Sequence, residues 1–377
     1  MNILTTAAAL AASALCASTL ADFATVVIDY APAPGQFVNN STFNDPQDAL
    51  GPPMGGGTLA PDNSRVLSLG GFGGSVTLGF DQPVENDPAN PMGLDFIVFS
   101  NASWAGGNPN VRWAEAAIIE IAVDANENGV ADDPWYLIPG SHLGSPPAAP
   151  AMQEWDNDAG TATPPQNVAW YPQGAPSPMT TTGRTLPELF NQITLPNPLG
   201  PGASMEGVWG YADLSPTIRL GDRSGAIGGA NDNSIDDPED DPAIEPGTFY
   251  TVPDDPFTVG IDPGSGGGDA FDIAWAIDPV TGAPANLLQF DFIRITNGAS
   301  AVAGVFGELS PEIDAVADVR PAAVAGDLNG DGVVDGADLA SLLSAWNATG
   351  GAADLNDDGI VNGADLAVLL ANWTGSA

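Results

Sequence analysis

From residue 22 to about residue 320 the chain consists of short apolar runs separated by clusters of Gly, Pro and Asn. The runs are of strand length and rich in β-branched and aromatic residues, which favours strands over helices. Five of them stand out, at 25–30, 75–80, 95–99, 117–123 and 290–295. Short strands at this spacing predict a mainly β fold, a β-sandwich or jelly-roll domain over 22–320.

A long segment with a different composition interrupts this pattern. Residues 139–268 are rich in Pro, Gly, Asn and Asp and carry several Trp and Tyr residues. Because a structureless loop of this length is unusual in a compact domain, we expect a loop-rich insertion with local strands of its own. The run at 290–295 follows the insertion, and the sheet needs it to close.

After residue 320 the period of the apolar positions changes from that of a strand to that of a helix. A linker is expected at 321–325, and a small module at 326–377 follows it. In the module, apolar residues recur at i, i+3, i+4 and i+7, which predicts two short amphipathic helices. We expect these residues to pack against one another as a small core: Leu339, Leu342, Leu343 and Trp346 with Leu366, Leu369, Leu370 and Trp373.

Each predicted helix follows a twelve-residue segment, 327–338 or 354–365, that has the spacing of an EF-hand calcium loop. Calcium is a hard cation that takes six to eight oxygens, and alternate residues of a tight loop point their oxygens at one centre. A glycine at loop position 6, Gly332 or Gly359, permits the turn. The pattern predicts two ions, with these ligands: Asp327, Asn329, Asp331, the Val333 carbonyl, Asp335 and Asp338; and Asp354, Asn356, Asp358, the Ile360 carbonyl, Asn362 and Asp365.

A third candidate loop, 124–133, lies in the large domain directly after a predicted strand. Its position 6 is Gly129, but its position 12 is Trp135, so a closing carboxylate has to come from elsewhere. A third calcium and an Asn/Gly-rich hairpin turn are the two alternatives for this segment. The calcium ligands would be Asp124, Asn126, Asn128, the Val130 carbonyl and Asp132.

The charge of the chain narrows the choice of partner. Acidic residues number 48 and basic ones 7, all of them arginine, which gives a formal net charge of −41. Such a charge argues against nucleic acid or an anionic membrane surface and favours divalent cations. A solvated acidic surface suited to a salty medium is the alternative, and both can hold.

The N-terminal segment 1–21 is typical of a secretory signal peptide, with a short apolar run and small residues at 19 and 21. We therefore expect a secreted protein, extracellular or at the surface of a bacterium. No later run is long enough to span a membrane. The single cysteine, Cys16, lies inside the predicted signal, so the mature chain would have no disulfides and bound metal is the obvious cross-link.

The two loop–helix repeats lack an entering helix, and in this they resemble the type I dockerin repeat. The residues that carry the resemblance are 326–340 and the copy around Asp354. The resemblance implies a calcium-dependent fold and a cohesin-type partner, and frequent attachment to polysaccharide-degrading enzymes or carbohydrate-binding modules. Residues 23–320 more faintly resemble bacterial extracellular jelly-roll segments of adhesin-like surface proteins, through 48–52, 68–80, 95–99, 114–116, 268–272 and 314–318.

Two functions remain open for the large domain. The first hypothesis is a non-catalytic binding or surface module, with polysaccharide as a candidate ligand, carried by a dockerin. The alternative is a glycoside hydrolase that degrades polysaccharide, which needs only two carboxylates; candidates are Glu115, Glu120, Glu154, Glu188 and Glu206, with Trp155, Trp170 and Trp209 as sugar-stacking residues. The single histidine, His142, is expected in an exposed loop, and no nucleophile-elbow motif accompanies it.

Overall fold

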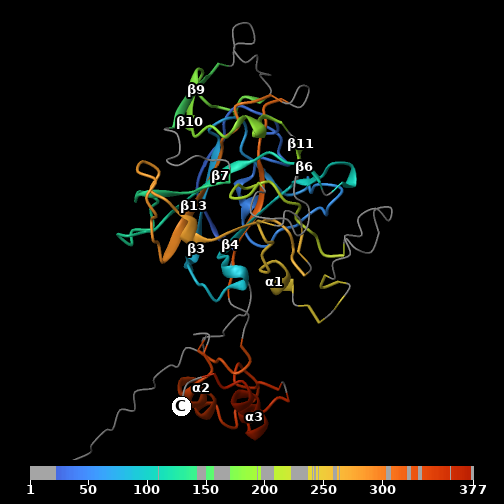
Figure 1. Cartoon of the computed structure of the whole chain (residues 1–377), viewed down its shortest axis with the longest axis vertical. Helices are drawn as coiled ribbons and strands as arrows, with labels where there is room; N and C mark the ends of the chain where they lie inside the picture. The colour runs from blue at the N-terminus through green and yellow to red at the C-terminus, as the bar shows by residue number, and fades with distance from the viewer. Residues whose placement is uncertain are drawn as a thin grey trace, which may run out of the picture. The chain divides into compact units, whose positions relative to one another are not determined.

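Strands, most of them short, dominate the computed structural model of the chain (Figure 1). The chain divides into two compact units, Ala21–Pro321 and Ala322–Ala377, and each is treated by itself. The structure describes residues 23–108, 110–141, 150–156, 170–192, 194–196, 208–221, 237–239, 241, 243–244, 246–257, 261–262, 264–302, 307–320, 324–329, 333–356 and 358–374. The predicted mainly β class is confirmed.

The larger antiparallel sheet of the first unit contains four of the five strands that the sequence predicts most strongly. Its strand order is β1-β3-β13-β7-β8. The last strand of this sheet in chain order, β13, lies in the middle, between β3 and β7, so the run after the insertion does complete the sheet. The bounds are β1 Val26–Ala31, β3 Ser75–Glu85, β13 Gln289–Asn297, β7 Ala117–Ala122 and β8 Trp135–Ile138.

A second antiparallel sheet packs against the first. Its order is β12-β4-β14-β2, with β12 Asp269–Phe271, β4 Phe96–Ser100, β14 Glu312–Asp318 and β2 Leu67–Ser68. The apolar residues of the two sheets form one buried cluster. Phe96 of β4 meets Phe290 of β13 edge to face at 5.1 Å and stacks on Phe271 at 5.0 Å. The unit is therefore a β-sandwich, because the two sheets bury one face of each against the other.

The second sheet is covered on its outer face as well, which explains why β4 and β14 are buried along their whole length. The cover consists of the helix α1, Pro246–Phe249, with Tyr250 and neighbouring loop residues. Phe99 of β4 meets Tyr250 edge to face at 5.8 Å. A strand buried on both faces has a continuous apolar sequence rather than an alternating one, as in 95–99.

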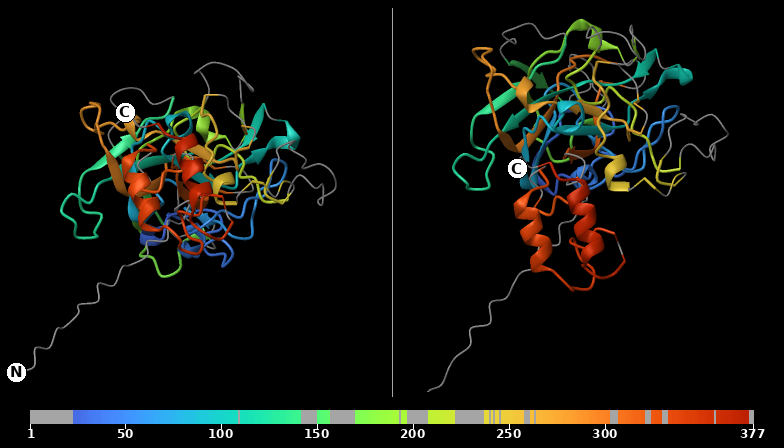
Figure 2. Two further views of the ribbon diagram at one scale, coloured as in Figure 1. Left: turned by 90° about the horizontal axis from the view of Figure 1, so that it is seen from below. Right: turned by 60° about the horizontal axis from the view of Figure 1, so that its bottom comes forward.

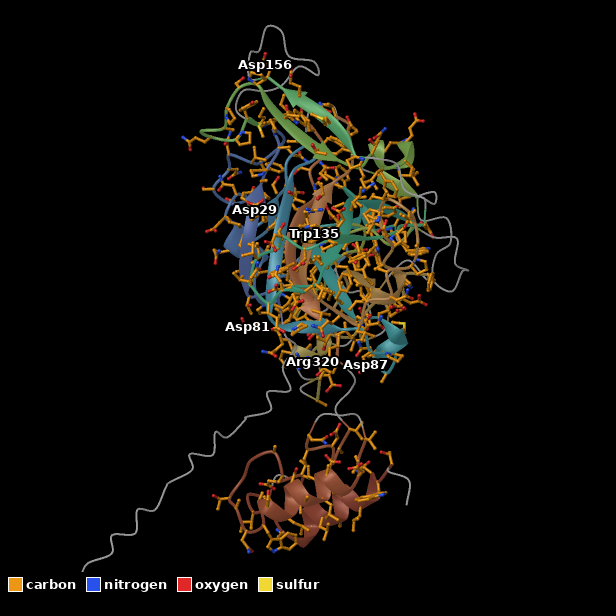
Figure 3. The ribbon with its side chains drawn as sticks, turned by 90° about the vertical axis from the view of Figure 1, so that its left-hand side faces the viewer. Asp29, Asp81, Asp87, Trp135, Asp156 and Arg320 are labelled. Atoms are coloured by element: carbon orange, nitrogen blue, oxygen red, sulfur yellow. The ribbon has the colours of Figure 1, made fainter. Side chains whose placement is uncertain are left out.

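Shorter elements complete the sandwich unit. Two small antiparallel sheets are formed by β5 Ser103–Trp104, β6 Val111–Trp113 and β11 Thr194–Pro196, and by β9 Ala151–Trp155 and β10 Met179–Gly183. Single turns of 3-10 helix lie at Pro46–Ala49, Pro91–Gly93, Ala105–Gly107, Glu188–Asn191 and Ile273–Trp275. Acidic side chains such as Asp29, Asp81, Asp87 and Asp156 lie at the surface of this unit (Figure 3).

The C-terminal unit contains two helices, α2 Gly336–Ser344 and α3 Gly363–Ala371, which lie side by side (Figure 2). Both begin at loop position 10, so the end of each twelve-residue loop is already helical, whereas the sequence pattern placed each helix after its loop. Residues at equivalent positions of the two repeats pair up in the small core: Leu342 and Leu369, Val334 and Val361, Leu339 and Leu366, and Leu328 and Leu355.

The predicted core of this unit was wrong for four of its eight residues. Leu343 and Trp346 of the first repeat, and their equivalents Leu370 and Trp373, have between 38% and 52% of their surface exposed. A helical pattern assigns the apolar residues at both i+3 and i+4 to the buried face. When two nine-residue helices pack together, however, each buries only a narrow row of side chains. Leu342 and Leu369 occupy these rows.

Several predictions concern residues outside the described part of the chain: the signal peptide at 1–21, His142, Glu206, most of the linker, and the loop ligand Asp331 with Gly332. Among the residues that are described, no helix has the length and apolar character needed to cross a membrane.

Candidate functional site

The second repeat shows how a calcium-type loop is built around its first residue. The Asp354 carboxylate accepts the backbone N–H of Gly359 on Oδ2 at 2.9 Å and that of Asp358 on Oδ1 at 3.2 Å. Asp358 Oδ1 in turn accepts the N–H of Ile360 at 3.0 Å. Gly359 has a φ of +87°, which only glycine adopts without strain. These bonds curl the backbone around the Asp354 carboxylate.

The last loop residue is an aspartate in both repeats, and its short side chain suits its position. Asp338 and Asp365 are the third residues of α2 and α3, and each forms a capping box with the residue that caps the helix. Asp338 Oδ2 accepts the N–H of Asp335 at 2.8 Å, and Oδ1 accepts that of Leu328 at 2.8 Å. Burial raises the pKa of Asp338, but these backbone N–H groups outweigh burial and hold it below its usual value.

The residue at loop position 9 caps the helix. Asp335 accepts the N–H of Ala337 at 2.7 Å, and Asn362 accepts that of Ala364 at 2.8 Å. In EF-hand loops this position often reaches calcium through a water, which suits a side chain already engaged by the helix. The Ile360 carbonyl accepts the Asn362 amide at 2.8 Å and keeps a second lone pair. The predicted metal ligands of each loop are all oxygen atoms, several of them from carboxylates, and such ligands fit calcium.

The third candidate loop, 124–133, has the same hydrogen bonds as the loop at 354–365. Asp124 Oδ2 accepts the N–H of Gly129 at 2.7 Å, and Asp124 Oδ1 accepts that of Asn128 at 3.0 Å. Asn128 Oδ1 accepts the N–H of Val130 at 2.8 Å, and Gly129 has a φ of +71°. Each bond has its counterpart at the same loop position in 354–365. This segment therefore has the local geometry of the loop at 354–365.

Sequence reasoning left the closing carboxylate of this third loop unidentified. Asp133 Oδ2 accepts the N–H of Ala125, the second loop residue, at 3.0 Å. In the first repeat, the second loop residue donates in the same way to the closing Asp338. Asp133 therefore takes the place that spacing alone assigned to Trp135. A bond from the N–H of Asp124 to Asp291 of β13, at 2.8 Å, fixes the loop to the larger sheet.

The two repeats of the C-terminal unit are joined by reciprocal backbone bonds. The N–H of Asn347, just past α2, donates to the carbonyl of Val361 in the second loop at 2.9 Å. The N–H of Thr374, just past α3, donates to the carbonyl of Val334 in the first loop at 3.0 Å. Both donors and both acceptors are 27 positions apart, so the bonds are equivalent. We call this pair of bonds the reciprocal clasp; it gives the unit a two-fold pseudo-symmetry.

The same symmetry duplicates an exposed apolar surface. Leu343 and Trp346 are 51% and 39% exposed, and Leu370 and Trp373 are 52% and 38% exposed. Nearly equal exposure at equivalent positions shows that the unit presents two similar apolar patches. We call the patch of Leu343 and Trp346 the first face and that of Leu370 and Trp373 the second face.

Two of the five carboxylates proposed for glycoside hydrolysis, Glu115 and Glu120, are engaged in other interactions. Glu115 is buried and accepts the Gln36 amide at 2.9 Å. Glu120 pairs with Arg294 at 2.7 Å, and the Arg294 guanidinium lies 4.2 Å from the centre of the Trp135 ring. Of the three candidate sugar-stacking residues, Trp155 is 2% exposed and belongs to a buried cluster. The described residues thus give this pair of glutamates no open substrate cleft.

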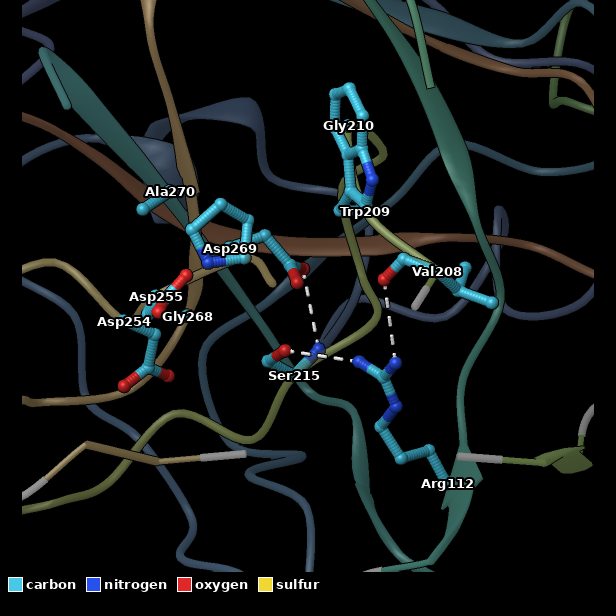
Figure 4. A pocket seen from close by; sticks show the side chains of 11 residues that line it. Arg112, Val208, Trp209, Gly210, Ser215, Asp254, Asp255, Gly268, Asp269 and Ala270 are labelled. Atoms are coloured by element: carbon cyan, nitrogen blue, oxygen red, sulfur yellow. Dashed lines mark hydrogen bonds between the residues drawn. The ribbon is translucent and has the colours of Figure 1, made fainter. Parts of the chain in front are cut away.

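A small pocket beside Trp209 holds other buried charges (Figure 4). Arg112 donates to the Leu214 carbonyl at 2.9 Å and to Ser215 Oγ at 3.2 Å, and the Asp269 carboxylate accepts the N–H of Leu214 at 2.7 Å. The cavity measures about 10 Å³, room for about one water and not for a sugar ring. Its arginine and aspartate therefore brace the backbone of the insertion.

Comparison with known proteins addresses only the C-terminal segment. No curated protein matches the chain. Residues 325–372 match the family model of the dockerin type I domain. The match starts just before the first loop and ends just after α3, so it spans both loops and both helices described above. The C-terminal segment is therefore of the type I dockerin kind, as its repeats predict, and dockerin domains bind calcium.

Proposed function

We propose that the C-terminal module docks the chain onto a cohesin-type partner through its first or second face, and that each of its two loops holds one calcium ion. The observation that carries the proposal is the duplication of exposed Leu and Trp on a module that matches the dockerin family. Exposed aromatic and aliphatic side chains next to small residues are typical of interface centres. Ala340 and Ala367, which are exposed beside Leu343 and Leu370, permit close approach of a partner.

The docking test is a pull-down of the full chain with candidate cohesin domains in saturating calcium. Leu343→Arg disables the first face and Leu370→Arg the second, because a charge would be desolvated in the interface. Binding should survive each single change and fail in the double variant. Thr349→Arg, exposed between the repeats, is the matched control and should bind as the unchanged chain does. Binding by the double variant, or no binding by any variant including the control, contradicts the proposal.

Calcium is proposed to fold the module as well as to occupy it. Residues 326–377 carry eight aspartates and no basic residue, so two calcium ions would cancel half of that charge. Short helices are marginal in water, and a module of this size buries little core. Circular dichroism of residues 322–377 should show little helix in EDTA and recovery of helix when calcium is added. Helicity that does not change with EDTA would reject the proposal.

A third ion is proposed at 124–133, supported by the hydrogen bonds this loop shares with 354–365 and by the place of Asp133. Calorimetric titration of residues 22–320 with calcium should reveal binding. Asp124→Ala and Asp133→Asn should each weaken the site, whereas Glu127→Gln, exposed in the same loop, should not. Equal binding by all three variants would favour a hairpin turn without metal.

For the large domain we propose a non-catalytic binding role, with polysaccharide as the ligand. A pocket of about 320 Å³ supports it, since small-ligand sites have about this size, and Gln153 and Glu308 provide polar groups in its lining. A glycan array with the full chain should detect binding that Gln153→Ala reduces. Release of reducing ends from the bound glycan would instead favour the glycoside hydrolase.

Secretion is part of the same proposal and depends on residues 1–21 acting as a signal peptide. N-terminal sequencing of the exported protein should then begin at Asp22.

A further inference from the structure

Three carboxylates that are far apart in the sequence meet inside the sandwich unit. Glu115 lies between β6 and β7, Asp213 lies in the insertion, and Glu312 is the first residue of β14. One oxygen from each lies within 4.8 Å of one oxygen from each of the others. All three side chains are buried, with 7%, 1% and 2% of their surface exposed. This group, the carboxylate triad, is separate from the three calcium-type loops.

Some buried acids of the unit accept hydrogen bonds on both carboxylate oxygens, whereas two members of the triad each have one oxygen without a donor. Asp95, for example, accepts the N–H groups of Asp87 and Ile273 and thereby ties loops together. In the triad, by contrast, Asp213 Oδ1 and Glu312 Oε1 are enclosed and have no hydrogen-bond donor. An enclosed carboxylate oxygen without a donor is costly, so each one needs an explanation.

A third unpaired group comes from a residue outside the triad. Ser100, the last residue of β4, is 1% exposed, and its Oγ faces the Asp213 carboxyl without a hydrogen-bond partner. Asn101 follows it and lies beside Glu312. In the described part of the chain, no arginine forms an ion pair with any member of the triad. Oxygen donors therefore gather here around no positive charge of the protein.

We propose that Glu115, Asp213 and Glu312 bind a calcium ion, with Ser100 as a further oxygen donor. Ca–O distances are about 2.3–2.6 Å, so ligands on opposite sides of the ion are about 5 Å apart, which agrees with the 4.8 Å spread of the triad. Magnesium usually keeps several waters, for which this enclosed group of side chains is unsuited. Zinc and softer metals prefer nitrogen and sulfur, which the triad lacks.

Hydrogen bonds already hold the three carboxylates in position. Gln36 donates its amide to Glu115, whose Oε1 also accepts the N–H of Ser310 at 3.3 Å. The N–H of Glu312 donates to Asp213 Oδ2 at 3.3 Å, and the N–H of Glu115 donates to the Asp213 carbonyl at 3.2 Å. An ion here would connect β14 of one sheet, the start of β7 in the other, and the insertion. It would cross-link these elements in a chain whose single cysteine leaves no second cysteine for an internal disulfide.

The test removes the loop sites first and then asks whether one ion remains. The full chain with Asp124→Ala, Asp327→Ala and Asp354→Ala serves as the background, because each change takes the first ligand from one loop. After desalting, elemental analysis of this background should find about one calcium per chain. Asp213→Asn added to the background should abolish it, whereas Asp269→Asn, a buried aspartate of the same region outside the triad, should retain it.

A second measurement is independent of the triad variants. The thermal unfolding midpoint of the background's β-sheet signal should fall when EDTA is added and recover with calcium, because an ion that binds only the folded state stabilises it. A folded background without calcium, and with a midpoint indifferent to EDTA, overturns the proposal: the carboxyls then keep protons and share them. Retention of calcium in the Asp213→Asn variant overturns the assignment as well.

Discussion

The reciprocal clasp makes the stability of the dockerin-like module depend on a hydroxyl close to its end. Thr374 accepts the N–H of Val334 on Oγ1 at 2.9 Å while its own N–H donates to the Val334 carbonyl. Val334 is completely buried at the edge of the first calcium loop. Thr374→Val keeps the shape of the side chain and removes only the acceptor, so the Val334 N–H would lose its partner.

The cost of this change is large compared with what the module can spare. A buried donor left without a partner costs about 1–3 kcal/mol. A domain of this length has a total stability of about 3–8 kcal/mol, at about 0.05–0.15 kcal/mol per residue. Thr374→Val should therefore remove a substantial part of the folding free energy, and because folding and calcium binding are coupled, it should also weaken calcium binding in the first loop.

The assay is urea denaturation of residues 322–377 at fixed calcium, followed by circular dichroism at a helical wavelength. Thr374→Ser is the control, since it keeps the hydroxyl, and it should lie close to the unchanged module. A Thr374→Val module as stable as the Ser variant would refute the reasoning, because it would show that the hydroxyl contributes nothing to holding Val334.

Further predictions concern the loops, the module core and a buried carboxyl. Gly359→Ala should destabilise the module by about 1–2 kcal/mol, because a side chain is strained at a φ of +87°. Gly363→Ala, at the start of α3, should instead stabilise it by about 0.5–1 kcal/mol. Both changes are measured by denaturation of the module in saturating calcium. Leu342→Ala should cost about 2–5 kcal/mol and Leu343→Ala under about 0.5 kcal/mol in the same assay; equal costs would contradict the assigned core. Burial raises the pKa of Asp95 to about 6, above its unfolded value, so ionisation of Asp95 disfavours the folded state and the free energy of unfolding should fall as pH rises from about 4 to 6. In pH-dependent denaturation of the full chain, Asp95→Asn should reduce that fall by up to about 3 kcal/mol. An unchanged pH dependence would contradict this origin.

Local patterns in the sequence predicted most of what depends on neighbouring residues. The strands at 75–80 and 290–295 were predictable because alternation and β-branching act within a few residues. The two helices followed from the spacing of their apolar positions, but their caps did not: the residue at position 9 of each loop, Asp335 or Asn362, also caps the helix. Which of Leu342 and Leu343 is buried was not predictable, because it depends on how closely α2 and α3 approach in the tertiary structure.

The carboxylate triad shows the same limit more sharply. Glu115 was one of five glutamates considered for catalysis, without anything to set it apart, and Asp213 and Glu312 were not considered. They are separated by about a hundred residues each, so no spacing rule connects them. Only the pairing of β14 with β4, and of Ala117 with Ala212, brings the three together. Asp133 was missed for a smaller reason: the third loop closes two residues earlier than the loop rule requires.

The order of the strands has a consequence for when the chain can fold during its synthesis. Each sheet receives an inner strand, β13 or β14, from residues 289–318, after all the strands that pair with it have been synthesised. Until then β3 has no partner on one side and β4 lacks β14. Such long-range pairing is slow to form, since loop closure must precede it. A nascent chain would therefore have neither sheet complete until residues 289–318 have been made, and if residues 1–21 direct export as proposed, it could pass through a translocation channel before it folds.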